Sequence, residues 1–176
     1  MPFATVKKKF QKLDKKQLVD LIGNLYKLNK SNQEYLDHFA EPDEAALFHK
    51  YKEQIIAAFY PPGNRPIDIP NARKALMAFQ KLHPSPEYAA SLLLVYVETG
   101  ISFCNDFGYV DDPILNSLSV KFEDALKFIE KENMIDTFKS KAFQITHDAS
   151  DIYTPISDYF ADLCQYYLGS NPHDPE

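Results

Sequence analysis

The chain has 176 residues, of which 45% are hydrophobic and 25% are charged, and its formal net charge is −6 at pH 7. This balance is typical of a globular protein and excludes disorder along most of the chain. A chain of this length most often forms one domain, and folding buries roughly 70% of the surface that the unfolded chain exposes. We therefore expect a single domain over residues 1–168.

The cysteines and the longest apolar run indicate the compartment. Cys104 and Cys164 are the only cysteines, and each lies inside a helical pattern, which favours reduced thiols over a disulfide framework. The opening residues, MPFATVKKKF, lack the apolar region of a secretory signal. The longest apolar run, residues 92–97, is far shorter than the ~20 residues that a membrane span needs. We expect a cytoplasmic protein without a membrane-spanning helix.

The first thirty residues carry two apolar patterns with helical spacing. A short stripe at Val6, Phe10 and Leu13 comes first. Asp14 then has the position of an N-cap, because its side chain can accept hydrogen bonds from the first backbone amides of a helix. The leucine-rich stripe that follows predicts a helix that ends at Asn29.

Two further helices are expected before a proline-rich break. Ser31 and Glu34 have the spacing of a capping box, which predicts the start of a short third helix. Pro42 can occupy the first turn of a fourth helix, whose apolar face extends to Phe59. Residues 60–70, YPPGNRPIDIP, contain four prolines and a glycine, so no helix is expected to cross them. We interpret this break as a surface connection within one domain.

The most apolar helix of the chain follows the break and one further helix that ends near His83. Ser85 as N-cap and Pro86 in the first turn predict its start, and Gly108 predicts its end. Its apolar character indicates that this helix lies at the centre of the fold.

The last third of the chain predicts three more helices. Asp112 as N-cap and Pro113 begin the first of them, and Leu118 and Phe122 belong to its apolar stripe. A second stripe follows, and the final helix runs from about residue 155 to Gly169, with residues 169–176 expected to be a disordered tail. The fold class is therefore all-α: an irregular bundle of about eight helices, or a stacked array of helix pairs.

Several segments resemble a bacterial family of proteins known only as a domain of unknown function, number 6155. These segments are VKKKFQKLDKKQLVDLIGNLYKLNKSNQEYLDHF, the EPDE that follows, the proline-rich break, NARKALMAFQKL, and SVKFEDALKFIEKENMIDTFKSKAFQI. The resemblance covers most of the chain and rests on helix-pattern motifs. It implies a small, cytoplasmic, all-helical bacterial protein, and it carries no catalytic residues.

Carboxylate and amide side chains gather where the most apolar helix is expected to end. These residues are Glu98, Ser102, Asn105 and Asp106, which share one helix face, and Asp111, Asp112 and Asn116, which follow at the next helix start. Such oxygen ligands suit Ca²⁺ or Mg²⁺, although the spacing is not that of an EF-hand. The cluster is a candidate for metal or small-ligand binding, and a solvated helix face is the favoured interpretation.

A His–Asp dipeptide gives a second metal candidate. His147 and Asp148 resemble the core of helical metal-dependent phosphohydrolases, with His83 as an upstream ligand and Asp158 or Asp162 as a downstream ligand. The spacing to His83 is long and that to Asp162 is short for that family. An exposed helix end, where polar residues are expected, is the favoured interpretation of the dipeptide.

Lysines are concentrated at the beginning of the chain. Residues 1–30 contain eight lysines and two aspartates, whereas the rest of the chain is acidic. The basic segment predicts contact with an acidic surface, either of a partner protein or of the same molecule. The candidate contact residues are Lys7, Lys8, Lys9 and Lys12. Because phosphate and base recognition usually enlists arginine and this segment has none, nucleic acid is the least favoured partner.

No motif in the sequence demands a particular chemistry, since a glycine-rich phosphate loop, a paired-cysteine metal motif and a nucleophile elbow are all absent. We therefore expect no cofactor and a non-enzymatic protein, an adaptor or regulator that binds another protein through a helix face, with self-association left open. The alternative is a metal-dependent hydrolase or a small-ligand binder that uses the acidic cluster or His147. Nucleic-acid binding ranks third.

Overall fold

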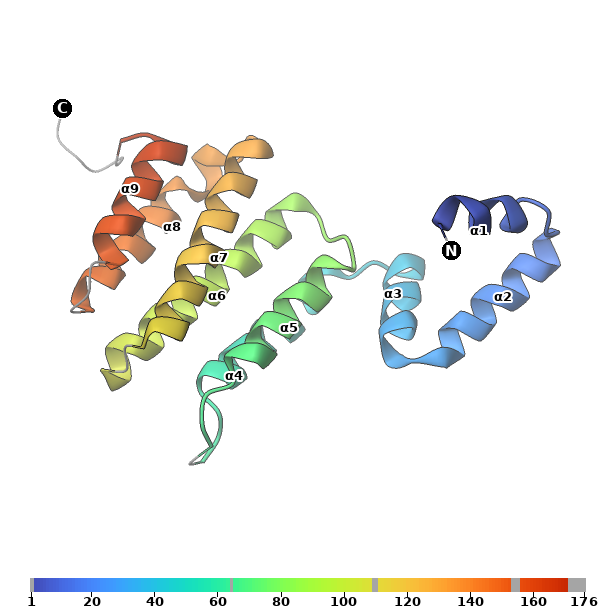
Figure 1. Ribbon diagram of the computed structural model, residues 1–176, viewed down its shortest axis with the longest axis horizontal. Helices are drawn as coiled ribbons and strands as arrows, with labels where there is room; N and C mark the ends of the chain where they lie inside the picture. The colour runs from blue at the N-terminus through green and yellow to red at the C-terminus, as the bar shows by residue number, and fades with distance from the viewer. Residues whose placement is uncertain (1, 64, 109–110, 153–155, 171–176) are drawn as a thin grey trace. The chain divides into compact units, whose positions relative to one another are not determined.

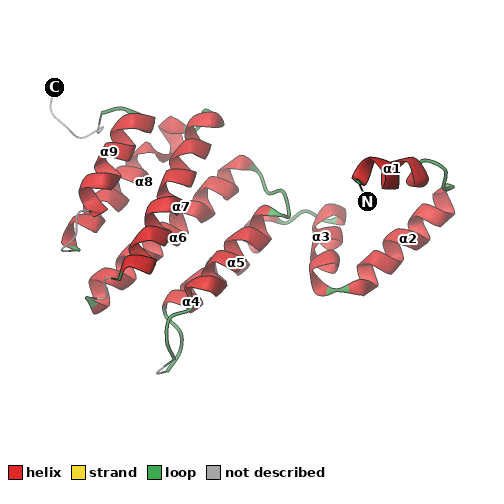
Figure 2. Cartoon of the chain, in the orientation of Figure 1, coloured by secondary structure: helices red, strands yellow, loops and turns green. Residues whose placement is uncertain are grey.

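The computed structural model describes residues 2–63, 65–108, 111–152 and 156–170. Within these ranges the chain forms nine α-helices and one short 3₁₀ helix, and it contains no β-strand (Figure 2). The predicted all-α fold class, a multi-helix bundle, is confirmed.

The described chain divides into two compact units, Met1–Asp43 and Glu44–Glu176. The boundary precedes the proline-rich break, which lies inside the second unit. The helices on either side of the break pack against each other, as expected for a connection within one unit. That residues 1–168 form one domain stays a prediction.

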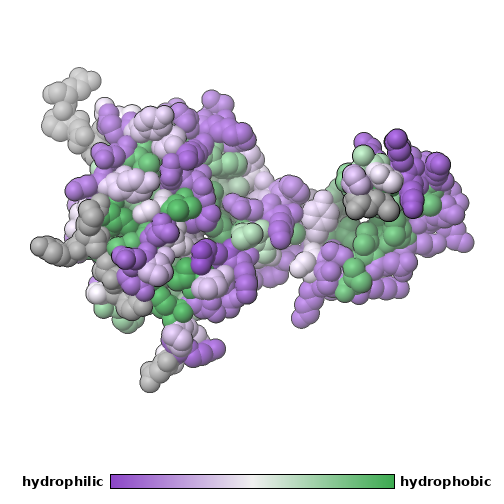
Figure 3. Space-filling model, in the orientation of Figure 1, coloured by the Kyte–Doolittle hydropathy of each residue, from purple (hydrophilic) through white to green (hydrophobic). Residues whose placement is uncertain are grey.

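The first unit contains the helices α1 (Phe3–Phe10), α2 (Lys15–Leu28) and α3 (Lys30–Ala40), of which α2 and α3 pack together (Figure 1). Asp14 and Gln17 form a complete capping box at the start of α2. The Asp14 carboxylate accepts a hydrogen bond from the backbone amide of Gln17 at 2.8 Å. This confirms the predicted cap. No described side chain of the three helices is buried, and hydrophobic atoms lie on the surface of this unit (Figure 3).

The two helix starts predicted at Ser31 and Pro42 were wrong. Helix α3 begins at Lys30, and its N-cap is Asn29, whose side chain accepts a hydrogen bond from the backbone amide of Asn32 at 2.9 Å, so Ser31 already lies within the helix. Asn29 has both a polar cap side chain and the extended backbone of an N-cap, and it therefore ends one helix and begins the next. Pro42 precedes the next helix rather than lying in its first turn.

The second unit is built around its longest helix. Its elements are α4 (Glu44–Phe59), α5 (Ile69–Gln80), α6 (Pro86–Phe107), α7 (Asp112–Lys131), α8 (Ile135–Asp148), η1 (Ala149–Asp151) and α9 (Ile156–Leu168). Helix α6 packs against α4, α5, α7 and α8, and ten of its residues are buried. The prediction that this helix is central is confirmed. Helix α9 completes the unit by packing on α7 and α8.

Three helices of this unit run in the same direction and therefore end on the same side. Tyr60, just after α4, contacts Asp106 near the end of α6, and Asn105 contacts Asp148 at the end of α8. The carboxyl ends of α4, α6 and α8 are consequently close in space, although they are far apart in the sequence. This arrangement brings together the polar residues predicted from the sequence.

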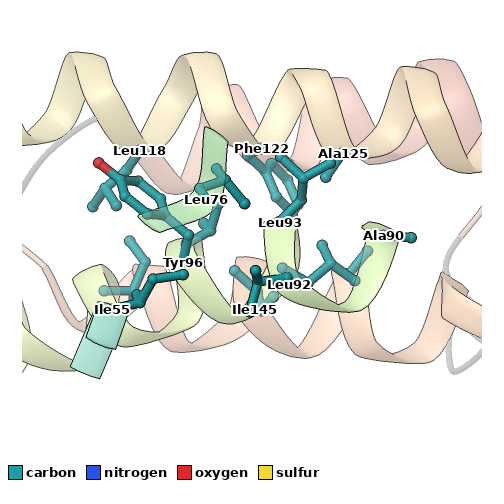
Figure 4. Close-up of a cluster of buried hydrophobic side chains, with 14 of the residues drawn as sticks. Ile55, Leu76, Ala90, Leu92, Leu93, Tyr96, Leu118, Phe122, Ala125 and Ile145 are labelled. Carbon is teal, nitrogen blue, oxygen red and sulfur yellow. The ribbon is translucent and has the colours of Figure 1, made fainter. Parts of the chain in front are cut away.

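The centre of the core lies between α6 and α7 (Figure 4). Leu93 and Tyr96 of α6 lie against Phe122 and Leu118 of α7, and all four are almost fully buried. The hydroxyl groups of Tyr96 and Ser117 are 2.6 Å apart, so these two buried groups form a hydrogen bond with each other. The predicted burial of Leu118 and Phe122 is confirmed.

Glycines end two helices of this unit as the sequence predicts. Gly108 follows α6 with φ 59°, and Gly169 follows α9 with φ 74°; both are left-handed conformations that glycine adopts without a steric penalty. The tail predicted to be disordered comprises residues 169–176, and residues 171–176 lie outside the described residues, so this stays a prediction.

None of the described helices combines the length and the apolar character that crossing a lipid bilayer requires.

Candidate functional site

Three of the polar residues predicted near the end of α6 have partners on neighbouring elements, whereas Ser102 is exposed. Glu98 forms an ion pair with Lys141 of α8. The Asn105 side chain donates a hydrogen bond to the backbone carbonyl of Asp148 at 2.9 Å. The Asp106 carboxylate accepts a hydrogen bond from the Tyr60 hydroxyl at 2.7 Å. These contacts fasten α6 to α8 and to the residue that follows α4.

The remaining acidic residues of the predicted cluster stabilise the start of α7. Asp111, not Asp112 as predicted, is the N-cap, and its side chain accepts a hydrogen bond from the Ile114 amide at 2.9 Å. Asp112 lies in the first turn, where a negative charge interacts favourably with the helix dipole. Across the described ranges, no three His, Cys, Asp or Glu side chains come close enough together to hold a metal ion. The metal hypothesis therefore gains no support from the geometry.

The His–Asp dipeptide lies at the end of α8. His147 is exposed, and the Asp148 carboxylate accepts a hydrogen bond from the Gln144 side chain at 2.7 Å. His83 precedes the start of α6, whereas Asp148 contacts its last turns. Because the 22 residues of α6 extend over about 33 Å, His83 and His147 lie at opposite ends of the unit. The structure does not bring these two histidines together.

Aromatic side chains cluster beside Asp106, where α4 and α6 end. The rings of Phe103 and Phe107 have centroids 4.9 Å apart, and Tyr60 lies edge-on to Phe103 at 5.6 Å. Phe59 completes the cluster at 6.4 Å from Phe103. Burial of Tyr60, together with its hydrogen bond to the Asp106 carboxylate, raises the pKa of the Tyr60 phenol well above its usual range. The phenol therefore remains a neutral hydrogen-bond donor at physiological pH.

A cavity of about 410 Å³ opens next to these four rings. The proline-rich segment supplies its other wall, with Pro61, Pro66 and Ile67 as apolar residues and Arg65 as the charged one. From the sequence this segment was predicted only as a connection, and the cavity was not predicted. The available signal was a tyrosine, four prolines and an arginine in one short segment, which together provide rigid apolar surface and a charge.

The candidate lysines belong to the first unit. Lys7, Lys8 and Lys9 lie in the last turn of α1, where positive charge interacts favourably with the helix dipole, and Lys12 follows the helix. All four are exposed, and none forms an ion pair with a described residue. The basic segment is thus open to solvent on the surface of its unit.

Large apolar side chains are also exposed on this unit. Nine of the fourteen exposed large hydrophobic side chains among the described residues lie in it: Phe3, Phe10, Val19, Ile22, Leu25, Tyr26, Leu28, Tyr35 and Phe39. The most exposed are Phe39 at 78%, Phe3 at 73% and Leu28 at 71%. Figure 3 shows hydrophobic atoms of this unit gathered on the visible face and bordered by hydrophilic ones. The sequence predicted these apolar stripes, but not that they would remain uncovered.

Comparison with known proteins adds a family but no activity. Neither the curated proteins nor the solved structures include a significant match to the chain. The model of the family of unknown function DUF6155 matches residues 1–160, which is most of the chain. This all-helical protein therefore belongs to the family DUF6155.

Proposed function

We propose that the protein acts as an adaptor or regulator that binds another protein through its first unit, residues 2–43. The expected partner presents a helix or a surface with apolar residues flanked by carboxylates. The observation that carries this proposal is that α1, α2 and α3 bury none of their described side chains. The role is one of binding rather than catalysis.

The exposed apolar surface supports a binding role on energetic grounds. Each apolar side chain removed from water contributes about 1.5–3 kcal/mol when it becomes fully buried. Helices that bury no side chain gain little of this free energy against the entropy cost of ordering the chain. Large exposed apolar patches on folded proteins commonly mark interaction sites. A partner that covers Leu28 and Phe39 would supply the missing burial.

The charge of the first unit supports an acidic partner. Lys7, Lys8, Lys9 and Lys12 add positive charge next to the apolar residues of α1. Complementary charges steer association and select the orientation of the partner. The two arginines of the chain, Arg65 and Arg73, both lie outside this unit. Lysine without arginine favours a protein carboxylate surface over the bidentate contacts with phosphate that arginine makes.

The cytoplasm is the proposed compartment of this interaction. Cys104 and Cys164 are buried free thiols, which is typical of proteins from a reducing compartment.

The test is affinity capture from host lysate with two variants of the first unit. One replaces Lys7, Lys8, Lys9 and Lys12 by Glu, and the other carries Leu28→Ser with Phe39→Ser. Both change only exposed side chains of the first unit, so the melting temperature of the second unit, which holds the buried core, should stay the same. We expect the wild-type protein to capture a partner that both variants lose, and capture should weaken as salt screens the charges.

Matched controls carry the same changes on the second unit. The charge control replaces Lys50, Lys74, Lys81 and Lys131 by Glu, four lysines that are exposed like those of the first unit. The apolar control is Tyr166→Ser, whose side chain is as exposed as that of Phe39. Both controls should capture the partner as well as the wild-type protein does. Equal losses in variants and controls, or recovery that nuclease treatment abolishes, would contradict the proposal; the second outcome would indicate nucleic-acid binding.

A further inference from the structure

The cavity beside the ends of α4 and α6 belongs to the second unit and is independent of the interaction surface proposed above. We propose that it binds a small aromatic carboxylate, with the ring of the ligand among Phe59, Tyr60, Phe103 and Phe107 and its carboxylate on Arg65. The volume of about 410 Å³ lies within the range of cavities that hold small molecules.

The aromatic wall selects a flat apolar group. Rings in proteins attract one another in tilted or edge-on arrangements with centroids about 4.5–7 Å apart. The pairs Phe103–Phe107 at 4.9 Å and Tyr60–Phe107 at 6.0 Å already have such geometry. The Phe107 side chain is nevertheless 64% exposed, although it lines the cavity. An aromatic ligand would cover this exposed ring and extend the same packing.

The wall formed by the proline-rich segment is joined to α4 by a backbone hydrogen bond and has a second hydrogen bond within itself. The Asp68 amide donates a hydrogen bond to the carbonyl of Ala58 at 2.9 Å, which fastens the end of the segment to α4. The Arg65 Nε donates to the carbonyl of Pro62 at 3.2 Å within the segment. Prolines restrict the backbone on both sides of Arg65. A pre-organised wall lowers the entropy cost of binding a ligand.

The charges at the cavity select an anionic ligand. The Asp106 carboxylate lies next to the aromatic rings but accepts the hydroxyl hydrogen bond of Tyr60. Arg65 uses its Nε in the bond to Pro62, and its two terminal guanidinium nitrogens, which form no hydrogen bond with a described residue, can donate to a ligand. Two parallel donors match the two oxygens of a carboxylate. The cavity thus combines an aromatic surface with one cationic group.

The test is calorimetric titration of the full-length protein with three probes that share the naphthalene ring and carry substituents of different charge: 2-naphthoate, the neutral 2-naphthalenemethanol and the cationic 2-naphthylmethylamine. We expect naphthoate to bind about tenfold more tightly than the neutral probe, because a charge-assisted pair of hydrogen bonds to Arg65 is stronger than the neutral hydrogen bond that a hydroxyl group can form. Backbone chemical shifts should change at residues 60–68 and 103–108 when naphthoate binds.

Three variants separate the contributions of charge and aromatic surface. Arg65→Gln should reduce the affinity for naphthoate to that for the neutral probe. Phe107→Ala should reduce the affinity for both naphthoate and the neutral probe. Arg73→Gln, which removes the other arginine of the chain from an exposed position on α5, should leave the preference unchanged. The proposal is overturned if the wild type binds naphthoate no better than either other probe, if Arg73→Gln acts as Arg65→Gln does, or if the shifts lie elsewhere.

Discussion

At the scale of single residues, Gly100 shows how closely the helices of the core approach. A Cβ atom at this position of α6 would collide with the Leu118 side chain of α7 and would lie 3.1 Å from the Phe59 ring. Leu118 and Phe59 are both fully buried and cannot move away cheaply. We predict that Gly100→Ala destabilises the protein by about 1–3 kcal/mol, the usual cost of overpacking a core. Urea unfolding monitored by circular dichroism measures the change.

Gly23 is the matched control for this prediction. It lies inside α2, and a Cβ atom there would meet no heavy atom within 4 Å. Gly23→Ala should therefore raise the stability of its helix by about 0.5–1 kcal/mol, because alanine loses less backbone entropy. If Gly100→Ala were as well tolerated as Gly23→Ala, the packing described between α6 and α7 would be incorrect.

The two buried thiols predict a loss of stability at alkaline pH. Burial raises the pKa of Cys104 and of Cys164 from 9.0 to about 11, and the charge of Asp111 adds to the effect at Cys104. Below pH 9 the thiols are protonated in both states, whereas between pH 9 and 11 the unfolded chain loses its protons first. The free energy of unfolding should therefore decrease as pH rises from 9 to 11. Urea unfolding at pH 8 and at pH 10.5 measures this decrease in the free energy of unfolding.

A variant with Cys104→Ala and Cys164→Ala should lose less stability over the same pH interval. Part of the decline should remain, since burial also raises the pKa of Tyr60 and Tyr96. Stability that is constant or higher at pH 10.5 in the wild-type protein would show that the thiols are not buried as described.

At the scale of helices, the apolar stripes predict where helices form but not which of them are covered. The stripe of α2 and the stripe of α7 are both recognisable in the sequence, yet α7 buries seven residues and α2 buries none. Periodicity depends only on neighbouring residues, whereas burial depends on which other helix lies opposite. That information is distributed along the whole chain.

The starts of α2 and α7 show when a cap residue can be predicted from the sequence. Asp14 was identified correctly, and its capping box with Gln17 is complete. At α7 the sequence offers both Asp111 and Asp112, and the backbone places Asp111 at the cap. The choice depends on where the preceding turn ends, which a local pattern does not reveal.

The contrast between the helices predicts their hydrogen exchange. Amides in α6 and α7 are surrounded by buried side chains and should exchange slowly, near the limit set by global unfolding. Amides in α1, α2 and α3 should exchange much faster in the isolated protein, because no buried side chain protects these helices. Hydrogen–deuterium exchange with mass spectrometry measures both groups at once. Equal protection of α2 and α7 would indicate that the apolar surface of the first unit is already covered.

At the scale of the whole molecule, the sequence predicted the fold class and the central helix, but not the geometry of its polar residues. Glu98 and Asp106 were expected in one cluster, yet they contact Lys141 and Tyr60, which are 43 and 46 positions away in the sequence. The cavity was missed for the same reason, since its two walls come from segments separated by a complete helix. Long-range pairs of this kind have no local sequence signature.

The central claim is that the first unit is a protein-binding surface. A photoreactive phenylalanine analogue placed at Phe39 tests it most directly, with the same analogue at Tyr166 as the control, because both side chains are 78% exposed and belong to different units. We predict that illumination in host lysate joins the Phe39 derivative, but not the Tyr166 derivative, to one specific protein, and that replacing Lys7, Lys8, Lys9 and Lys12 by Glu abolishes the adduct. No adduct at Phe39, or the same adducts at both positions, would contradict the claim.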